Sequence, residues 1–420
     1  MTRPGPFDLI VFGATGFTGR LVAQYLLQAY GAGGKYASEA PTWAMAGRSQ
    51  GKLEQMRDEL GAPRDLPLIT VDAQDANALR AMTQQTKLVI TTVGPYQLHG
   101  EPLLKACVET GTDYVDLCGE PNWMADMVGR HHAGAQASGA RIVFSCGFDS
   151  VPFDAGVLYL QTQARKQFGA PLRHVQGRVK LMKGGLSGGT AASLLATLNA
   201  VDASPTLAAR MRDPFALTPG FKGPAQPDDS VAVFDEAAGS WAGPFVMATI
   251  NTKNVHRSNA LRGHAYGRDF SYDERQLTGA GVGGELRARG LASVTRIQNR
   301  LLGFAPTRKL IGRFGLPQPG QGPSLREREN GRYEVWFSGQ GPAGQRLRAV
   351  VRGDRDPGYG STCKLIAESA LCLIREVDRD VTPGGVWTPA AAMGTALIER
   401  LNARAGLTFE MVNVAARAAV

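Results

Sequence analysis

The chain has 420 residues, of which 43% are hydrophobic and 20% are charged, a composition typical of a soluble globular protein with two or three domains. Its formal net charge of +9 favours anionic partners, but no block of lysine and arginine is long enough to indicate a nucleic-acid-binding tail. No apolar run reaches the roughly 18 residues of a membrane span, and the five cysteines form no CxxC pair. We therefore expect a cytoplasmic protein with free thiols and without a signal peptide, a metal site or a nucleic-acid partner.

Near the N-terminus, an apolar run leads directly into three regularly spaced glycines. Leu9–Phe12 predicts a strand, and Leu21–Leu27, after a tight turn, has a helical pattern. In this turn Gly13 permits the bend, Gly16 lets a pyrophosphate approach the backbone, and Gly19 lets helix and strand pack closely. The N–H groups at the helix start would face the phosphates of a dinucleotide, although a purely structural turn is the alternative. The predicted cofactor-binding residues of the turn are Gly13, Ala14, Thr15, Gly16, Phe17, Thr18 and Gly19.

Strand and helix signals alternate through the first 150 residues. Apolar runs predict strands at 8–12, 42–46, 68–72, 88–93, 113–117 and 141–145. Helical patterns fall between most of them, at 49–60, 76–84, 100–110 and 123–138. This alternation predicts an α/β fold, in which residues 1–150 form a Rossmann domain with a doubly wound parallel sheet. Such a sheet binds its ligand at the carboxyl ends of the strands.

The alternation stops after residue 150, and the sequence then predicts a mixed α+β domain over residues 151–350. Strands are expected at 172–182 and 245–255, a hairpin at 332–337 and 346–352, a helix at 191–201 after the glycine-rich segment 184–190, and an irregular connection over 203–245. Two helices, at 360–377 and 389–405, are expected near the end of the chain. We expect residues 351–420 to pack back on the Rossmann domain, and the α+β domain to bind substrate or to form an oligomer.

The residues after the second predicted strand favour NADP over NAD. NAD-binding folds usually place an acidic residue there, which accepts a hydrogen bond from the ribose 2′-hydroxyl. This chain has Arg48 instead, whose guanidinium suits a 2′-phosphate, and Ser49 and Lys52 would complete a phosphate pocket. Asp72, after the third strand, is expected beside the adenine. The structural alternatives are that Arg48 stacks on the adenine or faces solvent, and that Asp72 caps a helix.

The loop after the fourth predicted strand passes the nicotinamide ribose in this topology. It adds Thr92, Val93, Gly94 and Pro95 to the predicted cofactor-binding residues, because Gly94 allows a close approach and Pro95 stiffens the turn. Tyr96 is the catalytic candidate, since its phenol would lie next to the nicotinamide and could donate a hydrogen bond to a developing enolate.

Other polar groups gather at the same edge of the sheet. Asp116, Glu120 and Asp149 follow the fifth and sixth strands, where carboxylates can serve as acids and bases or can cap helices and hold loops. His99 could supply a proton or simply face solvent. Backbone N–H groups of the glycine-rich segment 184–190 could hold an anionic or carbonyl group.

Several motifs together indicate a family. They are Gly-Ala-Thr-Gly-Phe-Thr-Gly at 13–19, Ala-Gly-Arg at 46–48, Val-Gly-Pro-Tyr at 93–96, Tyr-Val-Asp-Leu-Cys-Gly-Glu-Pro at 114–121 and Gly-Phe-Asp-Ser-Val-Pro at 147–152. Further motifs fall at 100–102, 185–187, 189–190, 322–324 and 384–389. In these motifs the chain resembles the saccharopine dehydrogenase-like oxidoreductases, and among them the bacterial trans-acting enoyl reductases, over nearly its whole length.

The resemblance implies an NAD(P)-binding Rossmann domain and a second α/β domain. Mycobacterial members are associated with reducing enoyl intermediates of lipid-linked polyketides, in trans to a synthase. We therefore expect an NADPH-dependent oxidoreductase that reduces an enoyl or related conjugated acyl group, on a small-molecule or acyl-carrier-linked substrate of lipid or polyketide type. Two alternatives stay open: a saccharopine-type amino-acid dehydrogenase, which needs two carboxylate clamps, and a non-catalytic NADP-binding, lipid-associated protein.

The region 295–316 bears on membrane contact. Eukaryotic relatives carry a long apolar segment there, whereas five basic residues and a proline interrupt this region here. Membrane insertion is therefore not expected. A peripheral contact through a basic amphipathic surface and a helix packed on its own domain both stay open, as does a homodimer.

Overall fold

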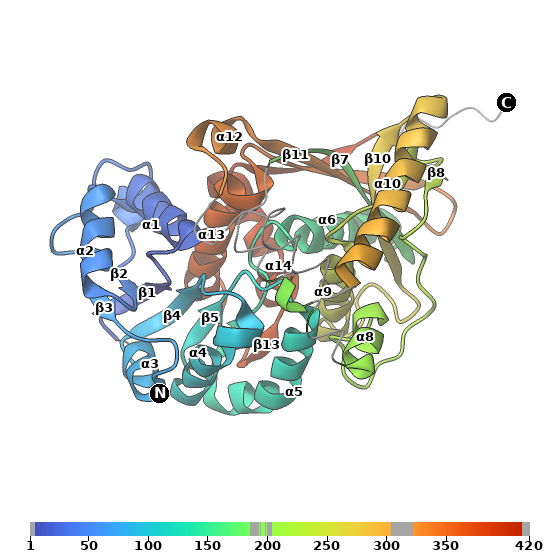
Figure 1. The fold of residues 1–420 in the computed structure, drawn as a ribbon. Coiled ribbons are helices and arrows are strands. Elements are labelled where there is room, and N and C mark those ends of the chain that lie inside the picture. The colour runs from blue at the N-terminus through green and yellow to red at the C-terminus, as the bar shows by residue number, and fades with distance from the viewer. Residues whose placement is uncertain are drawn as a thin grey trace.

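The structure is a computed structural model that describes residues 5–184, 193, 195–197, 199, 204–303 and 322–413, without the side chains of 298–303. Two seven-stranded sheets organise the chain (Figure 1). The first has the strand order β13-β6-β5-β4-β1-β2-β3 and the second the order β14-β12-β11-β7-β10-β9-β8.

All neighbours in the first sheet are parallel, which confirms the predicted doubly wound α/β fold. Its strands are β1 (Phe7–Phe12), β2 (Trp43–Gly47), β3 (Leu68–Thr70), β4 (Thr86–Thr91), β5 (Asp113–Val115), β6 (Arg141–Val143) and β13 (Gly385–Trp387). The first six correspond to the six predicted strands. The seventh was not predicted, because three residues are too short for a periodic pattern.

The helices of this domain cover both faces of the sheet. They are α1 (Phe17–Tyr30), α2 (Gln50–Glu59), α3 (Ala76–Thr83), α4 (Tyr96–Thr110) and α5 (Pro121–Ser138). Alternate residues of β1 explain the two layers, because Leu9 and Val11 pack in the core with α1, whereas Ile10 and Phe12 pack in the core with α3, α4 and α5. Helix α4 begins at Tyr96, four residues before its predicted start.

The second sheet is mixed. Its strands are β7 (His174–Lys183), β8 (Val233–Asp235), β9 (Ser240–Pro244), β10 (Ser271–Gly279), β11 (Arg332–Gln340), β12 (Arg346–Gly353) and β14 (Leu407–Val412). The predicted strand at 172–182 is β7, and the predicted hairpin is the antiparallel pair β11 and β12. Strands β7 and β10 are parallel. Helix α6 (Val151–Phe168), which was not predicted, packs on β11, β12 and β14.

Two predictions for the second half were wrong. The expected strand at 245–255 lies mostly in helix α9 (Ala248–Leu261), which is buried along most of its length although it is rich in polar residues. The region 203–245 contains α8 (Pro205–Arg212), β8 and β9 rather than only an irregular connection. Most of the glycine-rich segment 184–190 and of the expected helix 191–201 lies outside the described residues, as does 304–316. Before that last stretch, α10 (Gly281–Gly303) packs on β9 and β10.

Only part of the C-terminal region returns to the first sheet as expected for residues 351–420, because β14 pairs with β12 in the second sheet. After the short helix η2 (Pro357–Ser361), α13 (Thr362–Arg375) packs against α1, β4 and β5, and β13 extends the parallel sheet beyond β6. Glu368 of α13 is fully buried and accepts hydrogen bonds from Tyr25 and Tyr30 of α1. It also pairs with Arg400 at the end of α14 (Pro389–Arg400), which packs against α6 and α13 before the short helix η3 (Leu401–Ala405). Helix α1 of the N-terminal domain is thus joined to α13 and α14 of the C-terminal region by a buried ion pair and by hydrogen bonds to its carboxylate.

Candidate cofactor and active site

The turn between β1 and α1 has the geometry of a phosphate-binding loop. Gly13 adopts a left-handed φ of 85°, and its N–H donates to the Ala46 carbonyl at 3.0 Å. A Cβ on Gly19 would lie 2.1 Å from the Gly13 carbonyl oxygen, so only glycine lets the helix approach the turn this closely. Gly16 is exposed, and among the described residues a Cβ there would meet only the Gly13 oxygen, at 3.3 Å. The open side of the turn therefore lies over Gly16.

Helix α1 begins without the polar cap that its neighbours have. Ser49 and Asp75 cap α2 and α3, whereas Gly16 offers α1 no side-chain acceptor and its first turn holds no acidic residue. With respect to the described side chains, the first N–H groups of α1 thus remain available to an anion, which is the requirement for binding a pyrophosphate. These residues fit the diphosphate of a dinucleotide.

The remaining turn residues support this arrangement. Ala14 is buried, and Thr15 and Thr18 are half-buried. A Cβ on Gly47, at the end of β2, would lie 3.6 Å from the Thr15 hydroxyl oxygen, so the turn adjoins the carboxyl end of β2. Phe17 packs edge-on against Tyr359 of η2, with ring centroids 5.1 Å apart, and so connects the turn to the C-terminal region.

The residues predicted to bind the 2′-phosphate lie together after β2. Arg48 is exposed and has no hydrogen-bond or ion-pair partner among the described residues. The Ser49 hydroxyl oxygen accepts from the Lys52 N–H at 3.4 Å, which makes Ser49 the N-cap of α2. Lys52 is exposed one turn further on. Asp72 is exposed after β3, where it accepts from the Gln74 N–H at 2.8 Å, so its carboxylate has a local structural partner.

The loop after β4 meets the glycine turn, as its predicted role requires. The Thr92 hydroxyl donates to the Gly13 carbonyl at 3.3 Å, and a Cβ on Gly13 would lie 2.7 Å from Cγ2 of Val93. Gly94 is exposed and Pro95 half-buried. A Cβ on Gly94 would lie 3.7 Å from the Ser193 hydroxyl oxygen, so Ser193 lies beside this loop.

The structure gives Tyr96 a different role from the predicted one. Its side chain is 5% exposed, and its hydroxyl donates to the Thr91 carbonyl at 3.3 Å and accepts from the Leu117 N–H at 3.0 Å. Burial raises the pKa of the phenol well above its ordinary value. The ring packs against Trp123. Tyr96 therefore ties the end of β4 to the end of β5, and both hydrogen bonds of its hydroxyl lie within the fold.

Two of the three carboxylates at this edge also hold the backbone. Asp116 is fully buried and accepts from the N–H groups of Cys118 and Ser145, and burial raises its pKa to about 7. Glu120 accepts from the N–H groups of Tyr96 and Gln97 at 2.9 and 2.8 Å, so it caps α4. Asp116 and Glu120 thus hold a loop and cap a helix, which is the structural alternative to a role as acid or base.

The third carboxylate differs. Asp149 is half-buried in the loop between β6 and α6 and makes no hydrogen bond or ion pair with any described residue. Burial raises its pKa to about 6. His99, the other proton-donor candidate, is exposed on α4.

A buried polar cluster beside this loop was missed by sequence reasoning. Asn254 of α9 donates to the Ser150 hydroxyl at 2.7 Å, and that hydroxyl donates to Oδ1 of Asn251 at 3.3 Å. Asn251 in turn donates to the carboxyl of Glu274 in β10 at 2.9 Å. The only signal was the run of polar residues in α9, which on its own suggests an exposed segment rather than a buried one.

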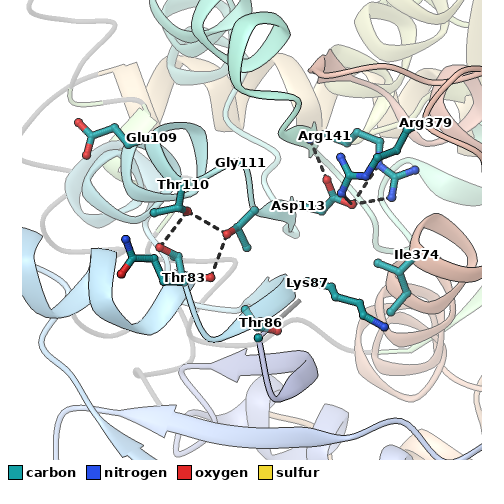
Figure 2. A pocket seen from close by; sticks show the side chains of 13 residues that line it. Thr83, Thr86, Lys87, Glu109, Thr110, Gly111, Asp113, Arg141, Ile374 and Arg379 are labelled. Atoms are coloured by element: carbon teal, nitrogen blue, oxygen red, sulfur yellow. Dashed lines mark hydrogen bonds and ion pairs between the residues drawn. The ribbon is translucent and has the colours of Figure 1, made fainter. Parts of the chain in front are cut away.

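A cavity of about 530 Å³ lies elsewhere, at the amino ends of β4, β5 and β6 (Figure 2). Asp113 is fully buried there between the guanidinium groups of Arg141 and Arg379. Both arginines also donate to backbone carbonyls, so their charges and donors are used within the fold. Because ligands of such sheets bind at the opposite, carboxyl edge, we assign this cavity a structural role.

Comparisons with known proteins agree with this geometry. The saccharopine dehydrogenase NADP-binding domain family matches residues 9–143. A Mycobacterium tuberculosis protein named provisionally as a trans-acting enoyl reductase is 40% identical over 434 residues, covering 98% of this chain and 99% of its own. Trans-acting enoyl reductases of Mycobacterium bovis and Mycobacterium ulcerans are 36% and 35% identical, and each alignment covers 94% of this chain and 95% of theirs.

Among solved structures, yeast saccharopine dehydrogenase (L-Glu forming) matches with a TM-score of 0.51 over 97% of this chain and 100% of its own. At 12% identity this match shows a shared fold. Within the described residues, every helix is too short or too polar to cross a bilayer. The chain is an NAD(P)-binding oxidoreductase, and it belongs to the trans-acting enoyl reductase branch of the saccharopine dehydrogenase-like family.

Proposed function

We propose that this protein uses NADPH to reduce the conjugated C=C bond of an enoyl thioester of lipid or polyketide type, presented as a small molecule or on an acyl carrier. The observation that carries the proposal is the similarity, over 98% of this chain, to a relative named for enoyl reduction. The open phosphate turn supports it, because it leaves room for a dinucleotide whose nicotinamide would lie at the ends of β4, β5 and β6.

The preference for NADPH rests on Arg48. Its guanidinium is exposed and unpaired among the described residues, next to the turn that would bind the pyrophosphate. An acidic residue at this place would favour the free 2′-hydroxyl of NAD, whereas a guanidinium favours a 2′-phosphate. Lys52, one helical turn on, adds a second positive charge.

When bound, the reduced nicotinamide supplies a hydride to the β-carbon of the enoyl group. The chain must then stabilise an enolate oxygen and supply a proton to the α-carbon. Tyr96 does not fit the first task, because both hydrogen-bonding positions of its hydroxyl are occupied within the fold. Backbone N–H groups of the glycine-rich segment 184–190, most of which lies outside the described residues, stay the candidates that the sequence offers for this task.

The test compares substrates of different classes at saturating NADPH. Crotonyl-N-acetylcysteamine serves as the enoyl thioester, with a ketone, an imine, and the pair of an α-keto acid with an amino acid as the competing classes. We expect NADPH oxidation and saturated product only with the thioester, and much slower oxidation of NADH. Turnover of the keto-acid pair instead would favour an amino-acid dehydrogenase. NADPH binding without turnover of any substrate would favour a non-catalytic role.

A further inference from the structure

The loop between β6 and α6 holds an acidic side chain at the place where the substrate should bind. Asp149 lies past the carboxyl end of β6, and β6 is two strands from β4 in the first sheet. In doubly wound sheets this edge carries the nicotinamide end of the cofactor. Asp149 thus lies at the carboxyl ends of the strands, as Gly94 does. Along the sheet it lies beyond β4, in the direction away from β2, where the adenosine would bind.

This loop is fixed on both sides of Asp149. The preceding Phe148 donates its N–H to the Thr362 hydroxyl at 3.1 Å, and its ring packs on Tyr333 with centroids 4.6 Å apart. The following Ser150 is held by Asn254 and Asn251 of α9. The backbone at Asp149 is therefore positioned by α13, β11 and α9 together.

The Asp149 carboxyl itself has no partner in the part of the chain that the structure describes. The side chain is half-buried, and its oxygens are not among the fully buried atoms that lack a partner, so both water and a ligand can reach the carboxyl on this rigid loop. Burial raises its pKa to about 6, and no charged side chain of the described residues contributes to this shift. A substantial fraction of the group is therefore protonated just below neutral pH.

Apart from the exposed His99, other acidic and basic groups near this edge already have partners within the fold. Asp116 and Glu120 accept backbone hydrogen bonds, and the Tyr96 hydroxyl bridges β4 and β5. Lys253 of α9 is buried and donates to the carbonyls of Met211 and Thr249. Several titratable groups lie at the carboxyl ends of β4, β5 and β6. Among those in the described residues, Asp149 is the one that is half-buried and has no hydrogen-bond or ion-pair partner.

We infer that Asp149 is the catalytic acid that protonates the α-carbon of the substrate, an inference that rests on the proposed function. Hydride addition at the β-carbon moves the electrons of the C=C bond into an enolate. The enolate then forms a C–H bond at the α-carbon as the O–H bond of the Asp149 carboxyl breaks. A proton from the solvent then reprotonates the carboxylate, so the net change is one C=C bond reduced, one NADPH oxidised and one solvent proton consumed.

The first test is Asp149→Asn, with crotonyl-N-acetylcysteamine as substrate. Asparagine keeps the size of the side chain but cannot give a proton, so we expect kcat to fall by about 10²- to 10³-fold, within the range for lost general acid catalysis. The Kd for NADPH should stay unchanged. Asp149→Glu, which keeps the acid, should retain more activity than Asp149→Asn. Asp65→Asn is the control, since Asp65 is exposed before β3, at the opposite edge of the sheet.

A second readout needs neither cofactor nor turnover. Infrared difference spectra of the cofactor-free protein should show a protonated carboxyl band that titrates near pH 6 and is missing in Asp149→Asn. An active wild type with an equally active Asp149→Asn would overturn the role of Asp149 alone. Loss of activity in His99→Asn instead would assign the proton to His99. A wild type that reduces no enoyl thioester would overturn the proposed function itself.

Discussion

At the scale of single residues, the cofactor preference depends on one exposed guanidinium. Arg48→Ala should weaken NADPH binding by about 1.5–3 kcal/mol, the usual contribution of a hydrogen bond to a charged group, which corresponds to roughly 10- to 150-fold in Kd. NADH binding should change little, because NADH has no 2′-phosphate. Calorimetric titration of both cofactors measures this difference.

The control for Arg48 is Arg64→Ala, which removes an exposed arginine side chain in the segment before β3 and should leave both affinities unchanged. If Arg48→Ala weakened NADPH and NADH equally, the guanidinium would bind a group common to both cofactors, and the proposed preference would be lost.

The hydroxyl of Tyr96 makes its hydrogen bonds within the fold, one of them to the loop that follows the neighbouring strand β5. Tyr96→Phe removes the acceptor for the Leu117 N–H, so we expect the free energy of unfolding to fall by about 1–2 kcal/mol. The kcat for an enoyl thioester should change by less than about threefold, far below the roughly 10²-fold loss typical of a missing oxyanion donor. Denaturant unfolding and steady-state kinetics measure the two effects.

Tyr159→Phe is the matched control for Tyr96, since the Tyr159 hydroxyl has no hydrogen-bond partner among the described residues. It should change neither stability nor kcat. A loss of kcat in Tyr96→Phe without a loss of stability would restore Tyr96 as the donor to the substrate.

At the scale of elements, the α9–β10 contact predicts a dependence of stability on pH. Glu274 is fully buried against Asn251 and Tyr272, and burial raises its pKa to about 8 from an ordinary value of 4.5. Below pH 4.5 the carboxyl is protonated in both folded and unfolded chains. Between pH 4.5 and 8 only the folded protein keeps the proton, so its stability falls as pH rises, by at most about 1.4 kcal/mol per pH unit from this group.

Glu274→Gln isolates this effect, because glutamine resembles the protonated acid and does not titrate. The variant should lose less stability than the wild type between pH 5 and pH 8, as measured by urea unfolding at each pH. Asp154 and Asp116, whose pKa values burial also raises, contribute equally to both proteins. Parallel stability curves for the two proteins would show that Glu274 is ionised in the fold.

How much the sequence predicts also differs between elements. The strand, turn and helix around Gly13 were predicted correctly because their signals are local: an apolar run, glycines at fixed spacing and a helical pattern. Helix α9 was predicted as a strand, because its burial comes from elements far away in sequence and its polar residues have partners such as Ser150 and Glu274. The contacts of the Tyr96 hydroxyl could not be predicted for the same reason, since its partner Leu117 belongs to another strand–helix loop.

At the scale of the whole molecule, the net charge of +9 bears on how the substrate arrives. If the acyl group comes on an acidic carrier protein, long-range attraction should speed the encounter, and salt should screen it, since the Debye length falls to about 10 Å at 0.1 M. We therefore expect kcat/KM for an enoyl group on an acyl carrier protein to fall several-fold between about 0.05 and 0.3 M salt. The control is the same enoyl group on uncharged N-acetylcysteamine at saturating NADPH, for which kcat/KM should change little. An equal fall for both substrates would mean that salt acts on the enzyme or its cofactor, and that the positive charge does not steer a carrier.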